Sequence, residues 1–396
     1  MTLAIVGVAA LALAACGAWL LASLWRRQVF VWLPDYLRRL ARGRPPHAGP
    51  THVMFCVADH FEPGRGRAQV DLQRARVRRW CEDYPRLCEG HRDADGRAPR
   101  HTFFFPDDEY RPEHLRALVE LCRAGFGEIE VHLHHDRDTA DGLRARLRTF
   151  VRRLSDDHGA LPLMPESGRP AWAFVHGNWA LDNARPDGLW CGVNDELAVL
   201  ADEGCYADFT LPCAPNPAQT RTVNSIYYAV DDPDRPKSHD RGVPVRVGGK
   251  PSGDLLLVQG PLGLNWRWRK HGILPRIENG DLRATAPPRP DRTDLWIRTH
   301  VHVLGRPEWV FVKAHTHGLH DSNPDTLLGP PTDALFRDLE TRYNDGRRYV
   351  LHYVTAREMY NIVKAAEAGL DGDPGRYRDF LVPAPTFDVA ARGVEP

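Results

Sequence analysis

Short runs of apolar residues recur along this chain and predict strands buried on both faces of a parallel sheet. We expect such strands at 52–58, 101–105, 128–134, 171–176, 206–211, 254–259, 309–315 and 349–354. Between several of them the apolar residues recur with the helical period, which predicts helices near 69–89, 111–124, 138–154, 194–203, 332–344 and 356–368. The segments 212–253 and 275–294 are rich in Pro, Gly and Asp and predict long functional loops. This alternation is typical of an α/β fold with a parallel sheet or barrel.

The first apolar stretch has a different character. From Leu3 to Trp25 it contains no charged side chain, and its length matches the ~20 residues that cross a bilayer as a helix. We therefore expect one transmembrane helix as an anchor in residues 1–25. Arg26 and Arg27 follow it at once, so the positive-inside rule predicts a single-pass protein of the inner (cell) membrane with its main domain in the cytoplasm. A lipoprotein cleavage box ending at Cys16 is the alternative, although apolar sequence continues beyond it.

The rest of the chain divides into three further segments. Residues 26–50 form a basic juxtamembrane linker, in which Gln28 to Ala41 is either an interfacial helix or a plain linker helix. Residues 51–370 are long enough for one large domain, and 371–396 are expected to be an irregular tail. The 52 basic and 52 acidic residues cancel, so no overall field attracts nucleic acid, and no nucleic-acid partner is expected. The eight cysteines contain no Cys-x-x-Cys pair and are expected to be free thiols.

Histidines and carboxylates gather at the predicted ends of three strands. Residues 128–136 read Glu-Ile-Glu-Val-His-Leu-His-His-Asp, and alternation along this strand would turn His132, His134 and Asp136 to one side. The strand at 52–58 runs into Asp59, His60 and Glu62, and a later strand ends at His315 and His317. Because the carboxyl ends of parallel strands meet at one edge, we expect these side chains to converge. Imidazoles and carboxylates at this density suggest a bound divalent metal. A polar rim without metal is the alternative.

The order of these motifs resembles the NodB-like polysaccharide deacetylases, a family of carbohydrate esterases of which this chain would be a divergent member. Residues 57–61 (Val-Ala-Asp-His-Phe) fall where the family has Thr-Phe-Asp-Asp-Gly, and residues 101–105 (His-Thr-Phe-Phe-Phe) look like its second strand. Residues 128–136 are similar to its Glu-Ile-Gly-x-His-x-x-x-His segment, and residues 200–208 to the stretch in which a helix ends in Gly-Tyr or Gly-Phe. The resemblance implies an irregular (β/α) barrel, here preceded by the transmembrane helix.

The resemblance also assigns roles to residues. Asp59 matches the catalytic base, and the metal ligands would be His60, His132 and Asp136, with the positions of Asp and His exchanged relative to the family. His134, His135 and Glu62 remain alternative ligands or partners of the ligands. The histidine that protonates the leaving amine corresponds to His315 or His317, between which the sequence does not choose. The family's Arg-x-Pro-Tyr motif is replaced by residues 176–179, so substrate contacts are expected from Glu62, His176, Asn178 and Trp179.

The function that follows is removal of acetyl groups from an N-acetylated sugar, polysaccharide or glycolipid precursor by a metal-dependent hydrolase, with zinc expected as the metal. The expected partners are this carbohydrate or glycolipid substrate and, through the N-terminal helix, the membrane. Two alternatives stay open. One is metal-dependent hydrolysis of another amide or of a phosphoester, and the other is an inactive, membrane-tethered glycan-binding barrel.

Overall fold

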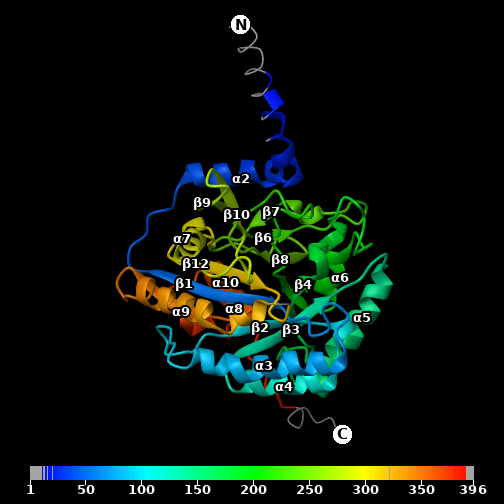
Figure 1. Ribbon diagram of the computed structural model, residues 1–396. Coiled ribbons are helices and arrows are strands. Elements are labelled where there is room, and N and C mark those ends of the chain that lie inside the picture. Colours follow the sequence, from blue (N-terminus) through cyan, green and yellow to red (C-terminus); the bar gives the residue numbers. More distant parts are fainter. Residues whose placement is uncertain (1–10, 12–13, 16, 20, 321, 389–396) are drawn as a thin grey trace, which may run out of the picture.

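A curved mixed sheet forms the centre of the molecule (Figure 1). The computed structural model describes residues 11, 14–15, 17–19, 21–320 and 322–388. The main sheet has the strand order β11-β12-β1-β2-β3-β4-β5-β8-β6-β7, with β13 also paired to β1, and β9 and β10 form a separate hairpin. The strands are β1 (Thr51–His60), β2 (His101–Pro106), β3 (Gly127–Leu133), β4 (Trp172–His176), β5 (Cys205–Asp208), β6 (Ile226–Ala229), β7 (Gly242–Pro244), β8 (Leu255–Val258), β9 (Gly263–Lys270), β10 (Leu274–Glu278), β11 (Asp281–Leu282), β12 (Trp309–Thr316) and β13 (Tyr349–Tyr353).

Helices cover both faces of the sheet. In Figure 1, α3 and α4 lie below it, α5 and α6 lie beside β3 and β4, and α2 crosses the opposite end near β9 and β10. The described α-helices are α2 (Val29–Arg42), α3 (Val70–Cys88), α4 (Pro112–Arg123), α5 (Ala140–Arg152), α6 (Glu196–Asp202), α7 (Pro290–Thr299), α8 (Asn323–Leu327), α9 (Pro330–Arg342) and α10 (Ala356–Glu367). The eight strands and six helices expected in the main domain are therefore confirmed, with their ends shifted by a few residues.

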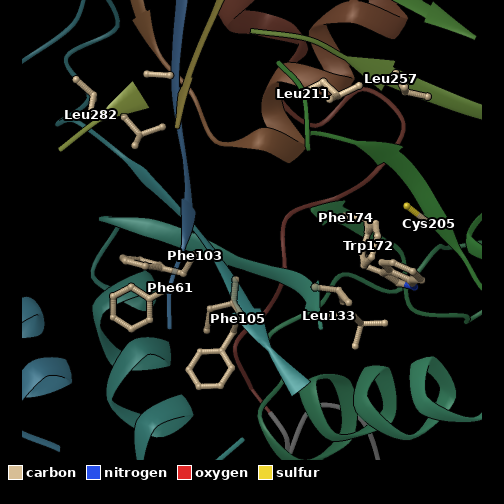
Figure 2. Close-up of a cluster of buried hydrophobic side chains, with 14 of the residues drawn as sticks. Phe61, Phe103, Phe105, Leu133, Trp172, Phe174, Cys205, Leu211, Leu257 and Leu282 are labelled. Carbon is tan, nitrogen blue, oxygen red and sulfur yellow. The ribbon is translucent and has the colours of Figure 1, made fainter. Parts of the chain in front are cut away.

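Alternation along β1 sorts its side chains into two cores. Phe55 and its odd-numbered neighbours pack into the larger core, which includes Trp80 of α3 and Leu115 of α4. Met54 and its even-numbered neighbours pack into a second core, which includes Met359 of α10. Figure 2 shows part of the larger core, where the rings of Phe61, Phe103 and Phe105 gather on one side of the sheet. Burying each such side chain contributes about 1.5–3 kcal/mol to folding, so the packing on both faces of the sheet is strongly favourable.

The expected (β/α) barrel is wrong, because the sheet is mixed and open. β6 pairs antiparallel with both β8 and β7, and among the described strands no ladder joins β7 to β11 to close a ring. Both short strands come from the segment 212–253, which was expected to be loop, and an antiparallel hairpin at the edge ends the parallel order. The hollow of this half-barrel is filled from within by side chains, including Lys313, whose Nζ donates to the carbonyls of Phe209 and Leu211 at 2.6 Å each.

The transmembrane helix expected in residues 1–25 has no counterpart in the described structure. Within the described part of the chain no helix is both long and apolar enough to cross a membrane, and most of the segment Leu3 to Trp25 lies outside the described residues. The helix that follows, α2, is amphipathic and docks on the domain. Its Trp32 is fully buried against Val223 and Leu262, and its Asp35 accepts a hydrogen bond from the Val223 amide at 3.1 Å.

Candidate metal centre

Three strand ends meet at one edge of the sheet. β1 lies between β12 and β2, and β2 pairs with β3, so the ends of β12, β1 and β3 are close in space. The His60 ring stacks on that of His317 with centroids 4.5 Å apart, and the edge of the His132 ring meets His60 at 4.8 Å. His134 is 4.5 Å from His132, and His320 is 4.6 Å from His317, again between ring centroids. The convergence expected from parallel strands therefore brings together five imidazoles.

Glu62 lies in the middle of these rings. Its Oε1 is 3.4 Å from His132 Nε2 and 3.5 Å from His134 Nε2, and its Oε2 is 2.8 Å from His320 Nε2. One ligand atom each from His60, Glu62 and His132 lie within 4.8 Å of one another. All three side chains are buried. We call these three residues the first cluster.

The donor atoms of the first cluster fit a divalent cation. His132 Nδ1 donates to the Val175 carbonyl at 2.8 Å, which leaves the lone pair of Nε2 directed toward Glu62. His132 Nε2 and His60 Nδ1 are both buried and have no hydrogen-bond partner in the described part of the chain. Two imidazoles and one carboxylate are a ligand set typical of catalytic zinc, with further positions open to water and substrate. A metal would satisfy nitrogen atoms that are otherwise costly to bury.

The protonation states also favour a cation. Burial, together with the neighbouring imidazoles, lowers the pKa of His60 well below its usual value, and burial lowers that of His317 to about 3, so both rings are neutral. Burial alone would raise the pKa of Glu62, but His132, His134 and His320 hold it well below its usual range. The first cluster therefore combines an anionic carboxylate with a neutral His60 ring. His134 differs, because Asp108 and Glu62 overcome its burial and raise its pKa to about 10.

An open cleft of about 540 Å³ leads to this centre. Glu62, His134 and Asn178 lie at its inner end. Its walls carry charged side chains at Arg65, Arg67, Asp108, Glu109 and Arg111. Glu109 accepts a hydrogen bond from the Gly64 amide at 2.5 Å, and burial raises its pKa to about 7. A cleft of this size and polarity can admit a polar, hydroxyl-rich or anionic molecule.

Asp59 faces away from the first cluster. As the residue next to His60 on an extended strand, it points to the opposite face of the sheet. Its Oδ2 lies 3.0 Å from His101 Nε2, its Oδ1 accepts a hydrogen bond from the Gly318 amide at 2.7 Å, and its exposed fraction is zero. Through these contacts Asp59 ties β1 to β2 and to the turn after β12.

The other predicted site residues divide into two sets. Trp179 lies beside the first cluster, with its ring centroid 6.1 Å from that of His60 and 5.5 Å from that of His317. His315 is buried on β12, two residues before His317. Asp136 lies outside the first cluster: it is partly exposed and accepts a hydrogen bond from the Trp190 amide at 2.5 Å. His135 and His176 also lie apart from the first cluster, in contact with Glu196.

Sequence reasoning missed several residues that the fold brings in. His320 contacts Glu62, and its spacing of three from His317 is a signal that was available. Arg65 and Arg111 reach the cleft from loops and carry no local signal. No protein-family model matches this chain, and no curated protein matches it. What the centre can do therefore follows from its geometry.

Proposed function

We propose that this protein is a metal-dependent hydrolase in which His60, Glu62 and His132 hold a divalent ion, with zinc as the expected metal. The observation that carries the proposal is the convergence of one ligand atom each from His60, Glu62 and His132 within 4.8 Å, in a buried site where His60 Nδ1 and His132 Nε2 lack hydrogen-bond partners among the described residues. A divalent ion at such a site polarises a carbonyl group and lowers the pKa of a bound water.

The surrounding side chains supply proton transfer. His317 is neutral and stacks on His60, so its ring can hydrogen-bond to a water held at the first cluster and orient it, although a pKa of about 3 makes it a weak proton acceptor. His134 is held in its charged form by Asp108 and Glu62 at the inner end of the cleft, so it can donate a proton to a leaving group. In this arrangement Asp59 has no direct contact with the first cluster, because it is turned toward His101.

For the substrate we propose an N-acetylated sugar or glycolipid precursor that loses its acetyl group. Asn178 and the arginines of the cleft offer hydrogen-bond donors to hydroxyl groups, and the Trp179 ring offers a flat apolar face beside the metal centre. The order of sequence motifs described above supports the same substrate class.

A second candidate is hydrolysis of a phosphoester. Arg65, Arg67 and Arg111 line the cleft, and guanidinium groups bind phosphate well. The two candidates share the metal centre and differ in the group that it attacks.

The test uses purified full-length protein, with acetate release from N- and O-acetylated sugars and phosphate release from phosphoesters measured with and without a chelator. We expect zinc bound at the first cluster, chelator-sensitive acetate release, and loss of both metal and activity in His132→Ala. His47→Ala is the matched control, since His47 is exposed and its ring hydrogen-bonds to Thr51.

Phosphate release without acetate release would favour the second candidate. A protein whose metal content is unchanged by His132→Ala would overturn both, and a metal-free protein that binds glycans would be a binding module.

A further inference from the structure

A second group of potential metal ligands lies at the ends of β3 and β4, next to α6. His135, His176, Cys191 and Glu196 each offer one ligand atom, and these four atoms lie within 4.8 Å of one another. All four residues are buried, and none of them lines a described cavity. We call them the second cluster.

Strand alternation separates the two clusters. His132 points to the same face of the sheet as His60, whereas His135, beyond the end of β3, reaches the opposite face. There it meets His176, which ends β4 on the side of Phe174 and the larger core. Cys191 comes from the loop after β4 and Glu196 from the first turn of α6. The second cluster therefore connects two strand ends, a loop and a helix.

The contacts within the second cluster converge on the Glu196 carboxylate. Its Oε1 lies 3.0 Å from His135 Nε2 and 3.4 Å from His176 Nε2, and Cys191 Sγ is 3.5 Å from Oε2. Zinc bonds of ~2.0–2.3 Å hold tetrahedral ligand atoms ~3.3–3.8 Å apart, so these separations suit four ligands around one ion.

A hydrogen bond on its far nitrogen orients the His176 ring for this role. His176 Nδ1 donates to the Gly177 carbonyl at 2.6 Å, so its Nε2 carries a lone pair directed into the cluster. This Nε2 is buried and has no hydrogen-bond partner in the described residues. On the far side of His135, the carboxylate of Asp138 approaches Nδ1 at 3.4 Å. A simple ion pair between His135 and Glu196 would leave the His176 nitrogen unsatisfied.

We propose that the second cluster is a structural zinc site with Cys191, His135, His176 and Glu196 as its four ligands. A thiolate together with imidazoles selects zinc over calcium or magnesium, and a closed, fully buried four-ligand set is typical of a structural site. Binding converts the Cys191 thiol to the thiolate and releases its proton to solvent. This inference does not depend on the proposed function.

A metal at the second cluster would stabilise the segment between His176 and Cys191. Residues 177–192 contain five non-glycine residues with left-handed backbone: Asn178, Trp179, Asp182, Asn183 and Trp190. This conformation is unfavourable for the two tryptophans and less so for Asn and Asp, so five such residues in one segment persist only if the surroundings hold them. The same segment carries Asn178 to the cleft and Trp179 to the first cluster. A zinc ion bound by His176, Cys191 and Glu196 would fix both ends of this segment.

Cobalt substitution tests the proposal on the full-length protein. Of the two clusters only the second contains a thiolate, so the Co²⁺-loaded protein should show thiolate-to-cobalt charge-transfer absorption. We expect Cys191→Ser to lose this band and one metal ion per chain, while Cys81→Ser, a matched change at a partly buried thiol outside both clusters, keeps both. His132→Ala should keep the band. Amide hydrogen exchange in residues 177–192 should rise in Cys191→Ser and not in His132→Ala.

The outcomes separate this inference from the proposed function. If one metal is bound and the band disappears only in Cys191→Ser, the second cluster is a zinc site and the first is not. If the unsubstituted protein shows no thiolate band, or if Cys191→Ser keeps it, the second cluster is not a metal site. Should Cys191→Ser fail to fold, the band of the unsubstituted protein and the metal content of His176→Gln decide the question.

Discussion

The Glu62 carboxylate contacts His132 across the sheet edge, with Oε1 3.4 Å from Nε2, and this contact joins the ends of β1 and β3. Glu62 follows β1 by two residues and His132 lies one residue before the end of β3, and both strands are packed in a core, so neither residue can move far without disturbing that core. The contact therefore places a carboxylate and an imidazole in fixed positions before any ligand binds, as a metal centre requires.

Replacing Glu62 with glutamine should weaken metal binding at the first cluster by more than about 100-fold, since even partners behind the ligands contribute 10–100-fold. The change removes the negative charge and keeps the size of the side chain. Competition with a chromogenic chelator measures the affinity. Glu166→Gln, at an exposed position, should leave it unchanged. Equal affinities in the two variants would show that Glu62 is not a ligand.

Asp59 is predicted to act through stability. Asp59→Ala leaves His101 and the Gly318 amide without their partner in a buried site, and should lower the free energy of unfolding by about 1–3 kcal/mol. Asp59→Asn should lose less, because its amide can accept from Gly318 and donate to His101. Denaturant unfolding and metal analysis check both, and neither variant should lose metal. A folded, metal-loaded Asp59→Asn protein with activity reduced more than about 100-fold would instead indicate a role in catalysis.

Gly177 follows β4 and packs against the end of β3 so closely that there is no room for a methyl group at its Cα. A Cβ at this position would lie 2.3 Å from His134 Cδ2 and 2.7 Å from the Leu133 carbonyl oxygen. Gly177→Ala should therefore displace the His134 ring from Glu62 and lower activity while the protein stays folded. Activity and circular dichroism measured on the same sample check this. Normal activity with unchanged spectra would mean that His134 has no part in the reaction.

Glu130 should make stability depend on pH. Burial raises the pKa of this carboxyl group to about 8, and the Ala173 amide donates to it at 2.6 Å. Between its ordinary pKa of 4.5 and this value, the folded protein keeps a proton that the unfolded chain has released. The free energy of unfolding should then fall as pH rises from about 4.5 to 8, by a few kcal/mol at most, at about 1.4 kcal/mol per unit.

Glu130→Gln removes this titration and should flatten that part of the pH profile. Unfolding by denaturant at a series of pH values gives the measurement for both proteins. If the two profiles run parallel, the carboxyl group is already ionised in the folded state.

The sheet was predictable where an apolar run stands apart from its neighbours, and not where a short run lies inside a segment with the composition of a loop. The runs that became β1, β3 and β12 stand out from their surroundings in the sequence. β6 and β7 have only four and three residues within a segment rich in Pro, Gly and Asp, and the short apolar run at 226–230 was overlooked among these loop residues. Those two strands decide that the sheet ends in an antiparallel edge and does not close into a barrel.

The sequence by itself determined eight of the described strands, most of the helices, and the concentration of histidine and carboxylate at strand ends, since these depend on residues that are neighbours in the chain. The tertiary structure alone decided which side chains share a centre. His132 and His135 are three positions apart, yet one contacts Glu62 and the other Glu196. The physical reason is that successive side chains point to opposite faces of a sheet. The residues that they meet on each face come from distant parts of the chain, and their positions depend on strand register, on the course of the loops and on helix packing.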